Sequence, residues 1–115
     1  MVAEFHRAAG MSPPTSPTVR DAAVRALRIR LVREEADEVV GALSAIDGDD
    51  SARLEQLAGL AKELSDLLYV TYGAAVDLGI DLAPIFEVVH RSNMAKFGEW
   101  GRRREDGKVL KPEAW

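Results

Sequence analysis

Two long stretches of helical periodicity, joined by one short turn, most strongly limit what this chain can fold into. From residue 18 to 43 apolar side chains recur at steps of three and four residues, as at Val24, Leu27 and Leu31. Residues 52–78 repeat this spacing with a row of leucines. Such steps keep side chains on one face of an α-helix. No segment shows the clear two-residue alternation of a strand, so the sequence predicts an all-α fold.

Local signals predict where the helices begin and end. Thr18 is expected to cap the first long helix, and Asp50 or Ser51 the second, because their side chains can accept hydrogen bonds from free N–H groups. Gly79 lies where the second helix needs a left-handed residue to end. Asp81 then follows as the expected cap of a third helix.

Both ends of the chain differ from this helical middle. The N-terminal arm, residues 1–17, is expected to hold a short helix that Gly10 ends, followed by a proline-rich linker. The third helix should run to about Phe97, and residues 98–115 form a polar, basic tail. A chain of this length fits a single domain over 1–115.

Composition excludes several classes of function. The chain has no cysteine, so disulfides, thiolate metal sites and cysteine nucleophiles are excluded. A net charge of −4 argues against a nucleic acid polymer as partner, although a small polyanion can bind through a divalent metal. No apolar run reaches the roughly 20 residues of a membrane span, and the N-terminus lacks the apolar core of a signal peptide. A cytoplasmic protein without a membrane partner is therefore expected.

The predicted helices carry more apolar surface than one chain can cover. Two long helices and a shorter one make a poor closed core, and each long helix would expose part of its stripe to water. We therefore expect a helical bundle of long antiparallel helices, completed by assembly as a homodimer or homotetramer.

Carboxylates interrupt both apolar stripes. Glu35 and Glu38 continue the stripe of the first long helix, with Glu34 at its edge, and Glu63 and Asp66 lie among core-facing positions of the second. The two helices are joined by a short turn and should pack antiparallel, so these groups can face each other. Either acidic run alone is also typical of a solvated helix face. Their occurrence in two facing stripes favours a built site.

Converging carboxylates need a cation, because they repel one another and lose solvation. Helical bundles commonly hold metals with inward-facing side chains, and di-iron bundles use Glu-x-x-His motifs. Here the second acid of each pair is Glu38 or Asp66, and oxygen-only ligands suit Mg²⁺, with Mn²⁺ as a substitute, rather than zinc. Such a metal can hold phosphate oxygens and a water for phosphoryl transfer.

Several motifs together resemble the MazG-like, all-α nucleoside triphosphate pyrophosphohydrolases. This superfamily includes MazG, the dimeric dUTPases and dCTPases, and phosphoribosyl-ATP pyrophosphohydrolase. The resemblance covers nearly the whole chain and is carried by the motifs Glu34-Glu35-x-x-Glu38, Glu63-x-x-Asp66, Glu4-Phe5-His6-Arg7, VHRSNMAKF from Val89 and REDGKVLKP from Arg104.

The resemblance implies Mg²⁺-dependent hydrolysis of a nucleoside triphosphate to the monophosphate and pyrophosphate, by a dimeric or tetrameric enzyme. It implies that Glu35, Glu38, Glu63 and Asp66 ligate the metal. Glu34 would bind a further ion or orient the attacking water, which makes Glu34 and Glu35 the expected catalytic pair. The expected role is control of nucleotide pools with a dUTP- or dCTP-like substrate. Phosphoribosyl-ATP hydrolysis in histidine synthesis and a non-catalytic interaction or nucleotide-binding module are the alternatives.

Substrate contacts are expected from three parts of the chain. They are Asn93, Lys96 and Arg91 on the third helix, Arg104 and Lys108 in the tail, and Phe5 and His6 in the N-terminal arm. Each group has a plainer alternative. The third-helix cations can satisfy helix C-terminal carbonyls, the tail can be a solvated end, and the arm can pack on the bundle.

Overall fold

A computed structural model of the chain describes residues 1–48, 51–97, 102–103 and 109–110. The elements in chain order are α1 (Val2–Ala8), α2 (Ala22–Ser44), α3 (Arg53–Asp77), α4 (Leu82–Ala95), β1 (Arg102–Arg103) and β2 (Val109–Leu110). By contacts the chain divides into two compact units, Met1–Ile80 and Asp81–Trp115, and each is described by itself. The helices confirm the all-α prediction, while the single domain over 1–115 stays a prediction.

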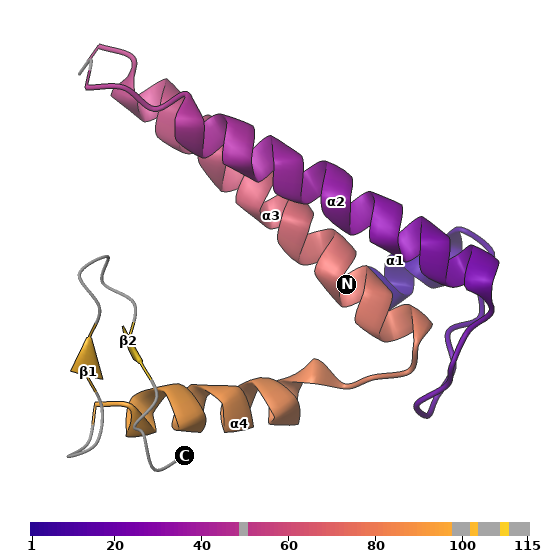
Figure 1. The fold of residues 1–115 in the computed structure, drawn as a ribbon. Coiled ribbons are helices and arrows are strands. Elements are labelled where there is room, and N and C mark those ends of the chain that lie inside the picture. Colours follow the sequence, from indigo (N-terminus) through magenta and orange to yellow (C-terminus); the bar gives the residue numbers. More distant parts are fainter. Residues whose placement is uncertain (49–50, 98–101, 104–108, 111–115) are drawn as a thin grey trace. The chain divides into compact units, whose positions relative to one another are not determined.

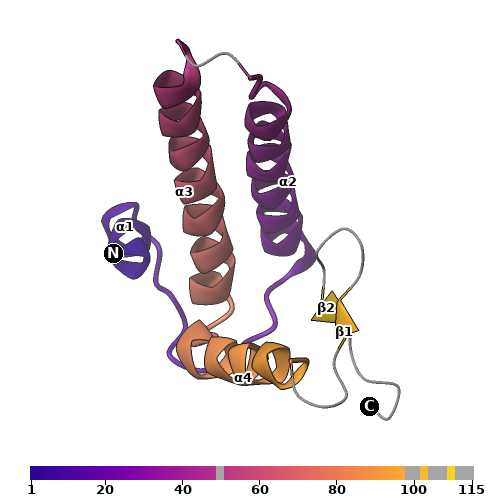
Figure 2. The same cartoon turned by 90° about the vertical axis from the view of Figure 1, so that its left-hand side faces the viewer.

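An antiparallel pair of long helices forms the frame of the first unit. Helices α2 and α3 lie side by side along their length, and α1 packs against α3 (Figures 1 and 2). Alanine, leucine, arginine and glutamate, which favour helices, dominate the interior of α2. The predicted pairing of the two long helices is confirmed, and it brings their apolar stripes together.

The N-cap of α2 corrects the prediction from the sequence. The helix begins after Asp21, whose side chain accepts a hydrogen bond from the Val24 N–H at 3.0 Å. The Thr18 hydroxyl instead donates to the Ser16 carbonyl at 2.8 Å, within the linker. Both Thr and Asp can cap a helix, so residue type alone does not decide between Thr18 and Asp21 as the N-cap of α2. The path of the linker decides it.

The start of α3 also differs from the prediction. Its N-cap position is Ala52, which makes no side-chain capping hydrogen bond, rather than Asp50 or Ser51. Of the two expected caps, Ser51 lies in the turn before the helix, and Asp50 lies outside the described residues.

Glycines end α1 and α3 in the same way. Gly10 has φ +84° and Gly79 has φ +67°, the left-handed conformation expected at this position. After α3, the Ile80 N–H donates to the Ala75 carbonyl at 2.8 Å, which is the bond of a Schellman motif. A side chain at Gly79 would overlap the carbonyl of Ser16, so the linker crosses the end of α3 in close contact. Both predicted helix ends are confirmed.

The apolar stripes of α2 and α3 are only partly covered. Among the described residues, the buried apolar side chains are Val39 and Ala75, and each keeps 7% of its surface exposed. Large apolar side chains on these two helices remain exposed, namely Leu27, Ile29, Val40, Leu43, Leu54, Leu57, Leu64, Leu68, Tyr69 and Tyr72. An apolar surface of this kind is expected if the helices of another chain cover it. Assembly as a homodimer or homotetramer stays a prediction.

The second unit begins with α4. Asp81 is its N-cap and accepts from the Ala83 N–H at 3.2 Å, as predicted, and Pro84 sits in the first turn, where no N–H partner is lost. The basic tail also contains a short antiparallel pair in which β1 faces β2. These strands of two residues were not predicted, because so short a segment carries no alternation. Within the described residues, no helix is long and apolar enough to cross a membrane.

Candidate functional site

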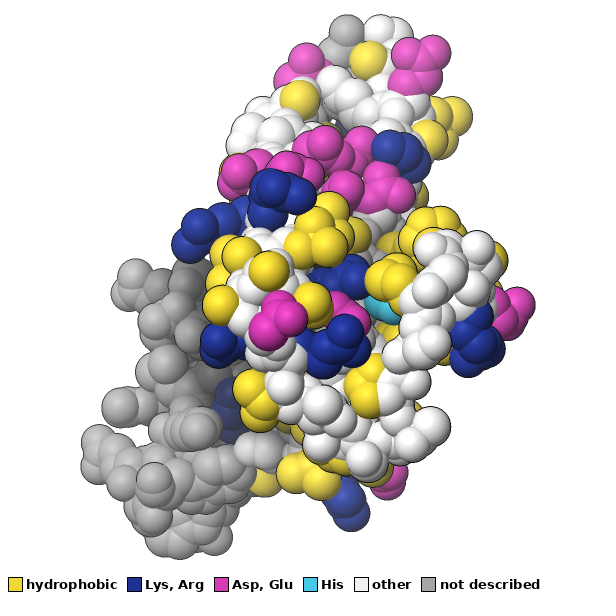
Figure 3. Space-filling view, turned by 90° about the vertical axis from the view of Figure 1, so that its right-hand side faces the viewer, with side chains coloured by type: hydrophobic (Ala, Val, Ile, Leu, Met, Phe, Trp, Pro, Cys, Tyr) yellow, Lys and Arg dark blue, Asp and Glu magenta, His cyan; other side chains and the backbone are white. Residues whose placement is uncertain are grey.

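Four carboxylates come together where α2 and α3 face each other. Glu35 and Glu38 lie one turn apart on α2, and Glu63 and Asp66 lie one turn apart on α3. One carboxylate oxygen from each lies within 4.8 Å of the others. Figure 3 shows acidic side chains gathered in a band on one face of the molecule. The structure therefore brings together all four residues predicted to ligate a metal; their role in binding it stays a prediction.

Two oxygens of this acidic cluster lack any hydrogen-bond partner. They are Oε2 of Glu35 and Oε2 of Glu63, and both are buried from solvent. Leaving a buried polar group unsatisfied typically costs about 1–3 kcal/mol, and more for a charged group. A cation held between the helices would satisfy both oxygens. The four residues therefore fit a hard divalent ion that prefers oxygen ligands.

The electrostatics of the cluster also favour a bound cation. Hydrogen bonding to Glu38 raises the pKa of Glu63 above its ordinary value, and loss of solvation raises it further, while nearby Lys62 acts in the opposite direction. Lys62 is largely exposed, and its Nζ lies 2.8 Å from Asp66 and 3.6 Å from Glu63. These contacts raise the pKa of Lys62. Lys62, at the edge of the acidic cluster, thus offsets part of the negative charge of the four carboxylates.

Glu34 does not belong to this acidic cluster. Its side chain is exposed on α2, next in sequence to Glu35, and it is not among the four grouped carboxylates. Asp37 is likewise exposed and outside the group. The predicted catalytic role of Glu34 stays a prediction, since only Glu35 of the expected catalytic pair lies inside the cluster.

A pocket of about 280 Å³ adjoins the acidic cluster between α1, α2 and α3. Its lining residues are Val2, Phe5, His6, Arg28, Leu31, Glu35, Asp66, Tyr69, Val70 and Gly73. Phe5 packs against Tyr69 with ring centroids 5.8 Å apart, and His6 is only 3% exposed. The two predicted substrate contacts of the N-terminal arm thus line the same pocket as two of the carboxylates.

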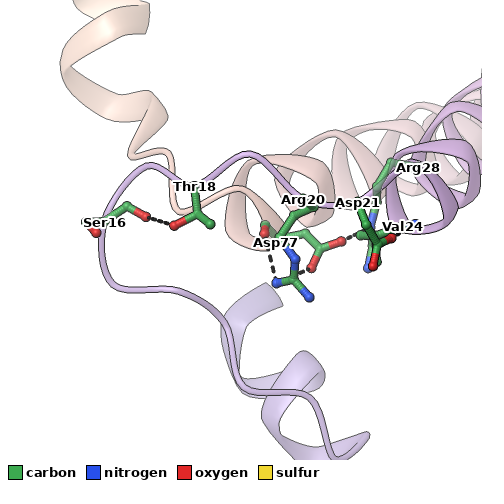
Figure 4. Close-up of polar contacts among 7 residues, drawn as sticks. All are labelled: Ser16, Thr18, Arg20, Asp21, Val24, Arg28 and Asp77. Atoms are coloured by element: carbon green, nitrogen blue, oxygen red, sulfur yellow. Dashed lines mark hydrogen bonds and ion pairs between the residues drawn. The ribbon is translucent and has the colours of Figure 1, made fainter.

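Arg28, which lines this pocket, belongs to a buried ionic network that the sequence analysis did not predict. The Nε of Arg28 contacts Oδ2 of Asp77 at 2.9 Å, and Nη1 of Arg20 lies 3.4 Å from Oδ1 of the same carboxylate (Figure 4). The Asp77 side chain is only 7% exposed. Burial, then nearby Arg28, lowers the pKa of His6, while Asp77 opposes the shift. The ion pairs of Asp77 join α3 to α2 through Arg28 and to the linker before α2 through Arg20.

A sequence signal for this network existed. Arg28 lies four residues after Val24 and three before Leu31, so it interrupts the apolar stripe of α2 just as Glu35 does. Asp77 occupies a corresponding buried place near the end of α3. Opposite charges at core-facing positions of two paired helices indicate a buried ion pair.

The remaining predicted substrate contacts lie in the second unit. At the C-terminal end of α4, the Nζ of the C-cap residue Lys96 donates to Oδ1 of Asn93 at 2.9 Å, so these two side chains lie together as their spacing predicted. Arg91 is exposed on the same helix. Arg104 and Lys108 lie outside the described residues. Contact of all five with a substrate stays a prediction.

Comparison with known proteins identifies the family of the chain. The sequence model of the phosphoribosyl-ATP pyrophosphohydrolase family matches residues 2–93, which include the acidic cluster and every residue lining the pocket. That family is a member of the MazG-like nucleoside triphosphate pyrophosphohydrolase superfamily. No curated protein matches the chain.

Proposed function

Since the chain belongs to the phosphoribosyl-ATP pyrophosphohydrolase family, we propose that it is a Mg²⁺-dependent pyrophosphohydrolase that acts on a nucleoside triphosphate. Water would attack the α-phosphorus, the bond to the β-phosphate would break, and the products would be a nucleoside monophosphate and pyrophosphate. The observation that carries this proposal is the group of four carboxylates, with two unpartnered buried oxygens, beside a pocket of nucleoside size.

The chain's own residues have distinct parts in this proposal. Glu35, Glu38, Glu63 and Asp66 would hold Mg²⁺, which when bound supplies positive charge to the phosphates and the leaving group. Glu34, which is exposed and next in sequence to Glu35, is proposed to accept a proton from the attacking water or to hold a further ion. No protein nucleophile is required, because phosphoryl transfer depends mainly on positioned charge.

The substrate is proposed to be a deoxynucleotide such as dUTP or dCTP. The pocket's volume of about 280 Å³ is near the lower end of small-molecule pockets. It suits a base and sugar whose phosphates remain at the acidic cluster. Phe5 and Tyr69 offer aromatic rings to the base, and His6 lies beside them.

Other parts of the chain would complete the enzyme. The Asn93–Lys96 pair and Arg91 are proposed to contact phosphates, and so are Arg104 and Lys108 of the tail. The exposed apolar faces of α2 and α3 support assembly as a homodimer or homotetramer.

A second candidate substrate is phosphoribosyl-ATP, as in histidine synthesis. The description of the matching family favours it directly. Both candidates need the same metal and the same bond cleavage. They differ in the base and in the size of the group attached to it.

A pyrophosphate-release assay tests the proposal. The panel would contain the common ribo- and deoxynucleoside triphosphates and phosphoribosyl-ATP, each with Mg²⁺. The Glu38→Gln variant should lose at least about a hundredfold in rate, as expected for loss of a preorganised charge at the reacting centre. The matched control is Asp37→Asn, which removes a carboxylate of the same helix outside the cluster and should retain activity.

Three results would count against the proposal. They are no pyrophosphate from any nucleotide, equal rates for wild type and Glu38→Gln, and equal losses in Glu38→Gln and Asp37→Asn. The first would favour a non-catalytic binding module, particularly if Mg²⁺ and nucleotides still raise the melting temperature.

A further inference from the structure

The pocket between α1, α2 and α3 has an acidic end and a cationic end. Glu35 and Asp66 mark the acidic end, and Arg28 and Gly73 mark the other. Arg28 precedes Glu35 by seven residues on α2, and Gly73 follows Asp66 by seven on α3. Seven residues are two helical turns, or about 10.5 Å. Because α2 and α3 are antiparallel, both separations run in the same direction, so the pocket extends about two turns away from the cluster.

The cationic end is deep and has hydrogen-bond donors to offer. Arg28 Nε is held by Asp77 at 2.9 Å, and the Arg28 side chain is 13% exposed. Its terminal nitrogen Nη1 lies beside Gly73, which lines the same pocket. A Cβ at Gly73 would lie 3.3 Å from Arg28 Nη1 and 3.4 Å from His6 Nε2, so the absence of a side chain there makes room for these two groups against α3.

A guanidinium carries donors only, which limits what it can recognise. If the phosphates of a nucleotide lie at the acidic cluster, the base enters the pocket with the edge opposite its glycosidic bond foremost. The substituent at that edge is on C4 of a pyrimidine or C6 of a purine. Uracil, thymine, guanine and hypoxanthine carry a carbonyl oxygen there, whereas cytosine and adenine carry an amino group, which is itself a donor.

We propose that Arg28, held by Asp77 at the floor of this pocket, recognises a carbonyl oxygen opposite the glycosidic bond and makes the site selective for oxo-bearing bases over amino-bearing ones. This inference rests on the proposed function for the placement of the phosphates. Of the two deoxynucleotides proposed above, it favours dUTP over dCTP. It also disfavours adenine nucleotides, including phosphoribosyl-ATP.

Gly73 and Asp77 are positioning residues in this scheme. Asp77 accepts a hydrogen bond from Nε of Arg28 and so fixes the orientation of the guanidinium plane. Gly73 allows Arg28 to lie close against α3, because a side chain at this position would crowd Arg28 Nη1. Neither needs to touch the base.

The test compares nucleotides that differ mainly at the recognised atom. The wild-type protein with Mg²⁺ should show a kcat/KM for dUTP about tenfold or more above that for dCTP, as expected for one matched against one mismatched contact. The dITP and dATP pair should show the same order. Calorimetric binding of dUMP against dCMP measures the same preference without catalysis.

Arg28→Gln assigns the preference to this side chain. A glutamine amide offers both a donor and an acceptor, so the dUTP to dCTP ratio should fall to within about threefold of one. Arg20→Gln is the matched control, because Arg20 binds the same Asp77 carboxylate but does not line the pocket. It should leave the ratio unchanged.

The outcomes separate this inference from the proposed function. The protein can release pyrophosphate with a kcat/KM for dUTP that is equal to or below that for dCTP, or Arg28→Gln can leave the dUTP to dCTP ratio unaltered. Either result would overturn the inference and leave the proposed function standing. Tighter binding of dUMP than dCMP without any hydrolysis would support base recognition and overturn the function. If Arg28→Gln fails to fold, the wild-type ratios alone decide.

Discussion

Replacing Asp77 with alanine should destabilise the first unit strongly. The carboxylate is 7% exposed and pairs with Arg28 at 2.9 Å and with Arg20 at 3.4 Å. Its removal leaves the Arg28 guanidinium, only 13% exposed, without a counter-charge. Breaking a buried ion pair from one side costs about 3–5 kcal/mol. Because the Arg20 side chain is 32% exposed and can return to water, the lower figure of about 3 kcal/mol is expected.

Urea denaturation at one fixed chain concentration measures this loss. With a slope of about 1.5 kcal/mol per molar, a loss of about 3 kcal/mol lowers the midpoint by about 2 M. Arg20→Ala should cost less than about 1 kcal/mol, since it removes the more exposed partner. A cycle with Arg28→Ala should show coupling between Arg28 and Asp77.

Two results would refute this reasoning. One is a loss below about 1 kcal/mol for Asp77→Ala, which would mean that the ion pair is solvated. The other is an equal loss for Arg20→Ala and Asp77→Ala, which would mean that the better-buried partner, Arg28, contributes nothing.

Three further predictions follow from single contacts. Gly79→Ala should destabilise the fold by more than about 1 kcal/mol, because the φ of +67° and the Ser16 carbonyl of the linker exclude a Cβ. Gly59→Ala within α3 should instead stabilise it by up to about 1 kcal/mol. Chemical denaturation compares the two variants. The pKa of His6 is lowered below its ordinary 6.5, so the unfolded state takes up a proton before the folded state as the pH falls. The free energy of unfolding should therefore decline below pH 6.5, and less steeply in His6→Gln. Equal slopes of unfolding free energy against pH in the two proteins would contradict this. Lys62→Gln removes a cation that lies 2.8 Å from Asp66, so the acidic cluster should bind Mg²⁺ several-fold more tightly at low salt, as measured by calorimetry. Weaker Mg²⁺ binding by this variant would contradict a metal site at the four carboxylates.

Features set by local spacing could be predicted from the sequence. The steps between Glu35 and Glu38 and between Glu63 and Asp66 fix one face of each helix, so antiparallel pairing was enough to bring them within reach of one ion. The left-handed end at Gly79 and the cap at Asp81 depend on single residues with strong local preferences.

Features set by the linker and by long-range packing could not be predicted in the same way. Thr18 and Asp21 are both good N-caps, and which one is used depends on where the linker meets the end of α3. The burial of His6 against Gly73 depends on how α1 packs on α3, which the short sequence of α1 does not specify. Charged side chains on helices are usually solvated, so the place of Arg28 in the apolar stripe of α2 indicates a buried ion pair only together with Asp77 on α3.

The most direct test of the central claim is phosphorus NMR of a reaction containing the protein, dUTP and Mg²⁺. The account predicts that resonances of dUMP and pyrophosphate grow with time and that a chelator abolishes them. Their growth should be at least about a hundredfold slower with Glu38→Gln and unchanged with Asp37→Asn. Orthophosphate with dUDP would contradict the proposed bond cleavage. Product formation unaffected by the chelator or by Glu38→Gln would contradict the assignment of the four carboxylates as a metal site.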